Sequence, residues 1–185
     1  MTNRTNKTLS TRNLTEIAVI TALLCVLGPL TIPIGPVPIS LAPLAILLGV
    51  YILGMKRGTI ACMMYLLIGT IGLPVFSGFS GGLGKLAGPT GGYLLGYIFL
   101  ALIAGFFIDR FWDRIPMQIV GMVLGVAVLY TFGTIWLAYQ AHLTPAAAFA
   151  AGAAPFIPMD LLKIAVAIFL GRTLRTRLRK AGVLS

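Results

Sequence analysis

Acidic side chains are scarce in this sequence: four Asp and Glu residues stand among 185, and charged residues of both signs make up only 10% of the chain. A soluble domain usually carries about 25% charged residues. Apolar residues make up 58% of the sequence, and its mean hydropathy is +1.00. This composition excludes a domain surrounded by water on all sides and indicates an integral membrane protein.

Histidine and cysteine are nearly as rare, with one His and two Cys in the chain. Cys25 and Cys62 each lie inside an apolar run and lack the spacing of a disulfide or zinc motif, so we expect both thiols to be free. The acidic residues are scattered, and His142 stands alone. The sequence therefore predicts neither a metal site nor a bound cofactor.

Two short matches to catalytic motifs lack the residues that their chemistry needs. Residues 78–82 fit the G-x-S-x-G pattern around Ser80, but that motif requires a histidine base, and His142 has no acidic neighbour to orient it. The Gly-Lys pair at 84–85 is followed by Leu86, where a P-loop has Ser or Thr. We expect a protein that is not an enzyme, with an intramembrane serine hydrolase as the weak alternative.

Six apolar segments occupy most of the sequence. A spanning helix needs about 20 residues, so six spans nearly exhaust the chain. We expect one all-α membrane domain over residues 1–185, with a polar tail (1–13), a bundle of six transmembrane helices (14–171) and a basic tail (172–185). The predicted segments are Leu14–Leu30, Ile39–Gly54, Gly58–Leu73, Gly91–Ile108, Met117–Ala138 and Phe156–Leu170.

The net charge of +10 would suggest nucleic acid binding in a soluble protein. Here the basic residues cluster between apolar segments, and basic residues of membrane proteins gather on the cytoplasmic side. With both termini in the cytoplasm, twelve of the fourteen Lys and Arg residues lie on that side, while Lys85 falls in an outer loop and Lys163 within a span. We therefore expect a lipid bilayer around the chain, a retained N-terminal tail and no nucleic acid partner.

The sharpest candidate for a functional site is a pair of charges in the last segment. Asp160 and Lys163 are three residues apart, which places both on one face of a helix. Charges within a spanning helix are costly and persist mainly where they pair or line a cavity. The pair either stabilises the helix as an ion pair or grips a ligand that presents both N–H and C=O groups, such as a cyclic urea or amide.

A glycine-rich outer loop between the third and fourth segments is the second candidate. Seven glycines occur from Gly72 to Gly91, and they alternate with the apolar residues Leu73, Val75, Phe76, Phe79, Leu83 and Leu86. Flexible linkers are rich in glycine but rarely so apolar. We therefore expect an ordered loop that closes over a pocket as a lid. Lys85 in this loop either meets a ligand carboxylate or is solvated.

Small residues recur at four-residue spacing in three places: Ala18/Ala22, Gly92/Gly96 and Gly121/Gly125. Such pairs let helix backbones approach closely in a bilayer. Taken one at a time, each pair most simply indicates packing within the bundle.

Three short motifs stand out in the sequence: Gly72-Leu-Pro-Val-Phe76, Gly88-Pro-Thr-Gly-Gly-Tyr-Leu-Leu-Gly96 and Pro158-Met-Asp-Leu-Leu-Lys163. Together they resemble the BioY family, the biotin-specific S components of energy-coupling-factor (ECF) transporters. The resemblance runs from the first helix to the last. The segment 35–42 is similar to the family's first outer loop, where Ser40 stands at a position that is often Thr.

The resemblance implies a six-helix bundle in a bacterial plasma membrane that captures biotin near its outer face and leaves it chemically unchanged. It also implies assembly with a transmembrane coupling protein and two cytosolic ATPase subunits, with Ala18 and Ala22 docking on the coupling protein. The alternatives are an S component for another small vitamin and a purely structural membrane subunit.

Ligand contacts follow from the same resemblance. Asp160 and Lys163 match the positions expected to hold the ureido ring of biotin, because a carboxylate suits an N–H group and an ammonium suits a carbonyl oxygen. Together with Lys85, the further expected contacts are Ser40, Phe76, Gly88, Thr90, Gly91, Gly92 and Tyr93.

Overall fold

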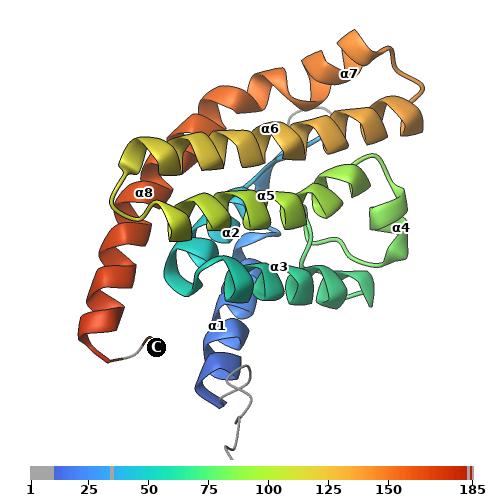
Figure 1. Ribbon diagram of the computed structural model, residues 1–185. Coiled ribbons are helices and arrows are strands. Elements are labelled where there is room, and N and C mark those ends of the chain that lie inside the picture. The colour runs from blue at the N-terminus through green and yellow to red at the C-terminus, as the bar shows by residue number, and fades with distance from the viewer. Residues whose placement is uncertain (1–10, 34–35, 183, 185) are drawn as a thin grey trace, which may run out of the picture.

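Helices make up most of this computed structural model, which describes residues 11–33, 36–182 and 184 (Figure 1). Within this part of the chain the longer helices are α1 (Thr11–Leu27), α2 (Ala42–Leu53), α3 (Met55–Thr70), α5 (Gly91–Arg110), α6 (Ile115–Gln140) and α8 (Ile157–Lys180). The short ones are α4 (Leu83–Ala87), α7 (Pro145–Gly152) and the 3-10 helix η1 (Ala154–Phe156). An antiparallel hairpin of β1 (Thr31–Ile32) and β2 (Ile39–Ser40) precedes α2.

Three stretches of the described chain are long and apolar enough to cross a bilayer: α5, α6 and residues 145–180, which end in α8. This confirms the prediction of a mainly helical membrane protein. The helices α1, α2 and α3 have 17, 12 and 16 residues. At about 1.5 Å per residue they are shorter than the roughly 30 Å hydrocarbon layer.

The shortest of these helices, α2, lies in the middle of the bundle. Eleven of its twelve residues are buried, and it packs against α1, α3, α5 and α8. Lipid cannot satisfy backbone polar groups, so irregular chain at membrane depth is tolerated only where protein covers it. The burial of α2 explains how a helix too short to span a bilayer is accommodated here.

Glycines bring α5 and α6 into close contact. A Cβ on Gly92 of α5 would lie 2.3 Å from Cβ of Trp136, and one on Gly121 of α6 would lie 2.2 Å from Cβ of Phe107. Neither position can carry a larger side chain unless the two helices move apart. The pairs Gly92/Gly96 and Gly121/Gly125 therefore pack the bundle, as their spacing predicts.

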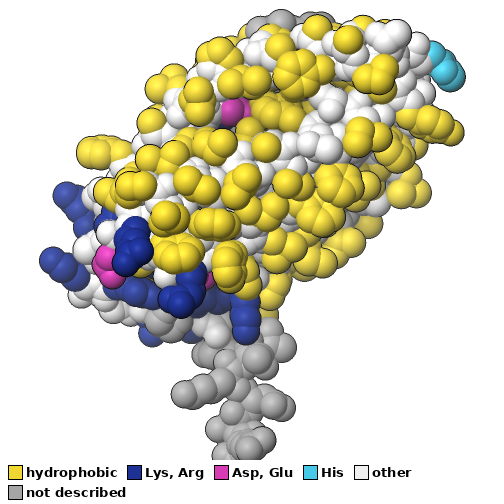
Figure 2. Space-filling view, turned by 45° about the horizontal axis from the view of Figure 1, so that its top comes forward, with side chains coloured by type: hydrophobic (Ala, Val, Ile, Leu, Met, Phe, Trp, Pro, Cys, Tyr) yellow, Lys and Arg dark blue, Asp and Glu magenta, His cyan; other side chains and the backbone are white. Residues whose placement is uncertain are grey.

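Basic side chains gather at one end of the molecule, and His142, the chain's single histidine, lies at the opposite end (Figure 2). The start of α1 and the end of α8 both lie at the basic end (Figure 1). There the side chain of Arg12 donates a 2.6 Å hydrogen bond to the carbonyl oxygen of Gly182. The first helix, α1, is thus joined directly to the residues that follow the last helix, α8.

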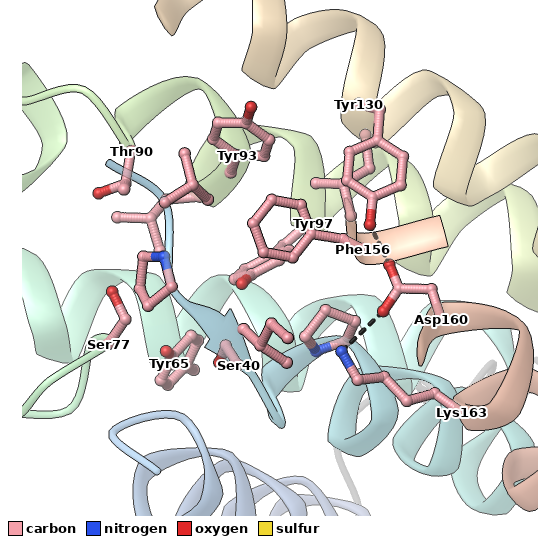
Figure 3. Close-up of a pocket in the computed structure, with 16 residues that line it drawn as sticks. Ser40, Tyr65, Ser77, Thr90, Tyr93, Tyr97, Tyr130, Phe156, Asp160 and Lys163 are labelled. Atoms are coloured by element: carbon pink, nitrogen blue, oxygen red, sulfur yellow. Dashed lines mark hydrogen bonds and ion pairs between the residues drawn. The ribbon is translucent and has the colours of Figure 1, made fainter. Parts of the chain in front are cut away.

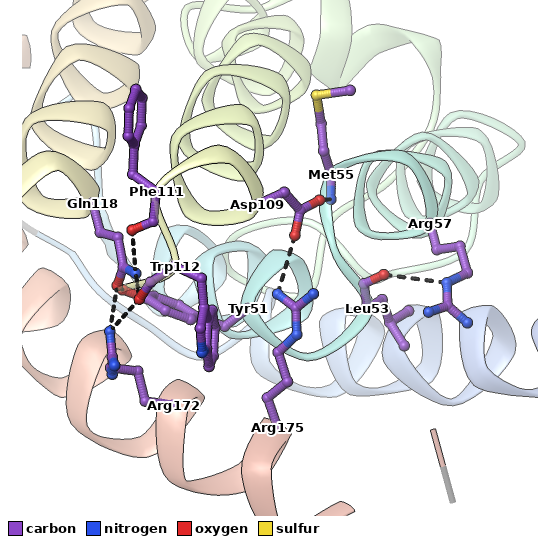
Figure 4. A network of polar contacts seen from close by, with 10 residues as sticks. All are labelled: Tyr51, Leu53, Met55, Arg57, Asp109, Phe111, Trp112, Gln118, Arg172 and Arg175. Carbon is purple, nitrogen blue, oxygen red and sulfur yellow. Dashed lines mark hydrogen bonds and ion pairs between the residues drawn. The ribbon is translucent and has the colours of Figure 1, made fainter. Parts of the chain in front are cut away.

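A polar network fixes the helices at this basic end (Figure 4). Gln118 of α6 accepts a hydrogen bond from the Tyr51 hydroxyl (2.9 Å) and donates to the carbonyl oxygen of Trp112 (2.7 Å). The guanidinium groups of Arg172 and Arg175 lie over the Trp112 ring, 5.0 and 4.7 Å from its centroid. Such cation–π contacts are favourable, and these join α8 to the turn between α5 and α6.

Asp109 of α5 caps the start of α3. Its carboxylate accepts a 2.7 Å hydrogen bond from the Met55 N–H, at the first residue of α3, and pairs with Arg175 at 3.1 Å. Gly54, which joins α2 to α3 with φ of +81°, leaves room for this acid, since a Cβ there would lie 2.9 Å from Oδ2 of Asp109. Asp109 thus supplies the helix cap that a glycine has no side chain to provide.

The chain departs from the predicted segments at several boundaries. The last helix does not end near Leu170 but continues to Lys180, so the predicted basic tail is largely helical. Arg and Lys have high helix propensity, so α8 continues beyond the end of the apolar segment. The connections between the longer helices contain α4, α7 and the β-hairpin. Most of the predicted polar tail lies outside the described residues. Both cysteines are free, as predicted.

Candidate functional site

A cavity lies at the end of the bundle remote from the basic network, between β2, α3, α5, α6 and α8 (Figure 3). It contains about 570 Å³ of space, its open mouth included. Its polar lining residues are Ser40, Tyr65, Ser77, Thr90, Tyr93, Tyr97, Tyr130, Asp160 and Lys163. Its apolar ones are Val37, Pro38, Ile39, Pro43, Leu94, Leu129 and Phe156.

Asp160 and Lys163 form the charged wall of this cavity. Nζ of Lys163 lies 2.7 Å from Oδ1 of Asp160, and the two residues are only 6% and 4% exposed. The hydroxyl of Tyr130 donates a hydrogen bond to the other carboxylate oxygen, Oδ2. Hydrogen bonds within the described chain therefore leave further carboxylate lone pairs and ammonium N–H groups available to a ligand.

The sequence around this pair explains its local structure. Pro158 lies in the first turn of α8, where a helix needs no backbone N–H donor. Asp160 belongs to the same turn, where the helix dipole favours a negative charge. The spacing of three residues then places Lys163 on the face of Asp160, as the sequence predicts.

The cavity wall also contains tyrosines that the sequence analysis missed. Tyr97 follows the expected contact Tyr93 by four residues on α5, so the helical period could have identified it. Tyr65 and Tyr130 come from α3 and α6. No local pattern in the sequence places those two on the cavity wall.

Five of the ten expected ligand contacts line the cavity: Ser40, Thr90, Tyr93, Asp160 and Lys163. The glycines of the motif lie behind the wall, where they pack the loop and the start of α5 against Trp136 of α6. The indole N–H of Trp136 donates to the carbonyl oxygen of Gly88 at 2.8 Å. A Cβ on Gly91 would lie 3.2 Å from the indole nitrogen, and one on Gly92 even closer to the Trp136 side chain.

The glycine-rich loop, residues 72–90, is ordered and attached to the bundle. The N–H of Gly78 donates a 3.1 Å hydrogen bond to the carbonyl oxygen of Pro29, next to the end of α1. Phe76 is fully buried and packs edge-on against Tyr65, with 5.6 Å between ring centroids. Phe76 therefore supports a lining residue from behind. These contacts are those of a folded segment and not of a flexible linker.

Lys85 lies in α4 of this loop and does not line the cavity. Its side chain is half-buried, and this burial lowers the pKa of its ammonium group below the usual value. In this arrangement the lysine does not reach the cavity wall.

Ser80 is not placed as a hydrolase nucleophile. It forms an isolated antiparallel bridge with Phe76, and its hydroxyl donates a 2.8 Å hydrogen bond to the carbonyl oxygen of Ser77. A nucleophile elbow instead holds its serine at a turn from strand to helix, against a histidine.

A second hollow runs along α1 and α3. Ala18 and Ala22 are exposed and line it, together with apolar residues such as Ile60 and Met64. This pair therefore differs from the glycine pairs of α5 and α6, because its exposed side chains leave room for another helix. The simplest interpretation of the pair, packing within the bundle, is wrong for these alanines.

A model of the BioY family matches residues 1–180. The chain belongs to the BioY family. The resemblance carried by the three sequence elements is thus confirmed.

Relatives in the BioY family carry consistent names. The biotin transporter BioY of Thermotoga maritima is 37% identical over 164 residues, which cover 89% of this chain and 96% of that protein. The biotin transporter BioY of Rhizobium etli is 38% identical over 175 residues, covering 89% and 93%. Both are transporters, which agrees with the prediction that this chain is not an enzyme.

A solved structure shares the fold. The crystal structure of the S-component for biotin from an ECF-type ABC transporter is similar to this chain with a TM-score of 0.83 and 33% sequence identity. The match covers 95% of each chain. The BioY family fold therefore extends over nearly all of the structure, including the helices that carry the cavity.

Two polar residues of the cavity should respond oppositely to removal of their hydroxyls. Thr90→Val should raise the stability of the ligand-free protein by about 1 kcal/mol, because the buried Thr90 hydroxyl has no hydrogen-bond partner among the described residues. Ser40→Ala should lower it by about 1–3 kcal/mol, because the Ser40 hydroxyl bonds the Gly28 carbonyl (3.2 Å) and the Ala42 N–H (3.0 Å).

Thermal unfolding of the two detergent-solubilised variants measures both effects. Equal destabilisation by both changes would mean that the Thr90 hydroxyl is bonded in the folded protein.

Proposed function

We propose that this chain captures biotin from outside the cell with high affinity and serves as the substrate-binding subunit of an ECF-type importer. The observation that carries the proposal is the buried pair of Asp160 and Lys163 on the wall of a cavity. Support comes from the relatives and the solved structure, which are named for biotin transport and for the biotin S-component.

The chemistry of biotin matches the polar and apolar residues that line this cavity. Its ureido ring presents N–H donors and a carbonyl acceptor, which suit the carboxylate of Asp160 and the ammonium of Lys163. Its thiophane ring and valeryl chain are apolar, and tyrosine rings with Leu94, Leu129 and Phe156 offer them a matching wall. The glycine-rich loop beside the cavity serves as its lid.

Replacement of one charge tests this site. Asp160→Asn keeps the shape of the side chain but removes the charge that accepts the ureido N–H. Loss of a hydrogen bond to a charged group costs about 1.5–3 kcal/mol, so the Kd for biotin should rise roughly ten- to hundredfold. Isothermal titration of the purified variant with biotin measures the change.

Asp113→Asn is the matched control, since Asp113 is exposed at the basic end and should leave the Kd unchanged. Normal binding by Asp160→Asn would remove this acid from the ligand site. A variant that fails to purify as a folded, monodisperse species would favour the reading of a structural ion pair.

We propose further that the chain crosses a bacterial plasma membrane six times, with both termini in the cytoplasm. The start of α1 and the end of α8 lie together at the basic end of the molecule, which requires an even number of crossings. Basic residues favour the cytoplasmic side, so the cavity and His142 face outward. Burial of α2 within the bundle allows its short helix to count as one of the crossings.

Single cysteines at the two ends test this orientation, in a background with Cys25 and Cys62 replaced by serine. His142→Cys should react with a membrane-impermeant thiol reagent added to intact cells, because it lies at the outer end. Lys180→Cys should react only after the cells are permeabilised. The reverse pattern would overturn the proposed orientation.

A transmembrane coupling protein, which works with two ATPase subunits, is the partner that we propose for the hollow along α1 and α3. Ala18 and Ala22 are exposed there at four-residue spacing, which permits close approach of another helix in the bilayer. The hollow is separate from the ligand cavity, since the two have no lining residue in common.

Ala22→Trp should therefore weaken co-purification of the chain with the coupling module and leave the Kd for biotin within about twofold, because the added ring fills the hollow. Val19→Trp is the control, since Val19 is 61% exposed on the same helix but does not line the hollow. Equal effects of both changes on assembly would show that the alanine face is not the docking surface.

A further inference from the structure

Tyr130 reaches the carboxylate of Asp160 from a different helix than Lys163 does. The Tyr130 hydroxyl, on α6, donates to Oδ2, while Nζ of Lys163, on α8, lies 2.7 Å from Oδ1 (Figure 3). With a partner on each oxygen, the carboxylate cannot rotate unless one of the two bonds breaks. The acceptor is thus held in one orientation before a ligand arrives.

The ring of Tyr130 is itself held in place. It packs edge-on against Tyr93 of α5, with 6.5 Å between ring centroids, and the Tyr93 hydroxyl donates a 2.9 Å hydrogen bond to the carbonyl oxygen of Gly152. A Cβ on Gly133 of α6 would lie 2.2 Å from the Tyr93 ring, so this glycine makes room for the ring. The contacts run from α7 through α5 and α6 to Asp160 on α8.

Tyr130 and Asp160 also separate the cavity from a cleft on the outside of the bundle. Both residues line the cavity and a cleft of about 810 Å³ between α6 and α8, whose other lining residues include Val123, Val126, Ile157, Leu161 and Ile164. Asp160 is 4% exposed and lines this mostly apolar cleft. A carboxylate close to hydrocarbon is costly unless it is paired, and the Tyr130 hydroxyl supplies a donor at this position.

We infer that Tyr130 is a positioning residue for ligand recognition, which fixes the Asp160 carboxylate toward the N–H donors of the ligand and covers it on the bilayer side. The inference rests on the proposed function, in which Asp160 accepts a ureido N–H. A carboxylate held at one oxygen keeps rotational freedom that binding must remove, and preorganised groups avoid that cost.

A double-mutant cycle tests the role of Tyr130, with isothermal titration of biotin as the measurement. Tyr130→Phe keeps the ring and its packing on Tyr93 but removes the donor. The Kd for biotin should rise roughly tenfold, the order expected for the loss of one hydrogen bond to a charged group. In the Asp160→Asn background the same change should alter the Kd by less than about threefold, because the carboxylate that Tyr130 orients is gone.

Two further variants separate positioning from a general loss of structure. Tyr51→Phe removes another buried tyrosine hydroxyl, bonded to Gln118 at the basic end, and should leave the Kd for biotin unchanged. Replacement of Tyr130 by 4-aminophenylalanine, which keeps an N–H donor at the same ring position, should restore most of the affinity lost in Tyr130→Phe. The infrared carboxylate band of ligand-free protein, assigned by subtraction of Asp160→Asn, should shift in Tyr130→Phe.

The outcomes distinguish the inference from the function on which it rests. Equal losses of affinity in both backgrounds would mean that Tyr130 contacts the ligand directly, and an unchanged Kd or carboxylate band would mean that it does not orient Asp160; each result overturns the inference and leaves biotin capture intact. Wild-type protein that does not bind biotin would overturn the proposed function, and the inference with it.

Discussion

The ion pair of Asp160 and Lys163 is the interaction on which the arrangement of residues around the cavity depends. Two charges taken out of water are favourable only when their geometry is good and their remaining hydrogen-bonding groups find partners. The chain supplies one such partner from a second helix, the Tyr130 hydroxyl, and places both charges on the wall of a cavity.

Close packing of α5 and α6 is what brings the tyrosines to this pair. Glycines on both helices remove side-chain volume where the partner helix has Trp136, Phe107 or Tyr93. A bilayer supplies no hydrophobic drive for helices to associate, so close van der Waals contact of this kind holds them together. The same glycines therefore stabilise the bundle and set the position of the cavity wall. This explains why the glycine motif matters to the site although its glycines lie behind the lining.

The two ends of the bundle use polar groups in different ways. At the basic end, contacts among polar and aromatic groups join the helices; they involve Asp109, Trp112, Gln118, Arg172 and Arg175. At the opposite end, the ion pair and the Thr90 hydroxyl, which has no partner among the described residues, leave bonding capacity toward a cavity. Polar groups thus hold the helices together at one end of the molecule and line a cavity at the other.

The sequence by itself determined that the chain is a helical membrane protein whose basic residues cluster between its apolar segments. It also determined that Asp160 and Lys163 share one face of a helix. These properties follow from composition and from the local period of a helix. It also carried the family, through three short motifs. Only the tertiary structure decided which motif residues reach the cavity: Phe76 and the glycines lie behind it, while Tyr65 and Tyr130 arrive from distant segments. Helix lengths and contacts between helices depend on packing over long sequence separations, so no local pattern could place Tyr130 on Asp160 or leave Ala18 and Ala22 exposed.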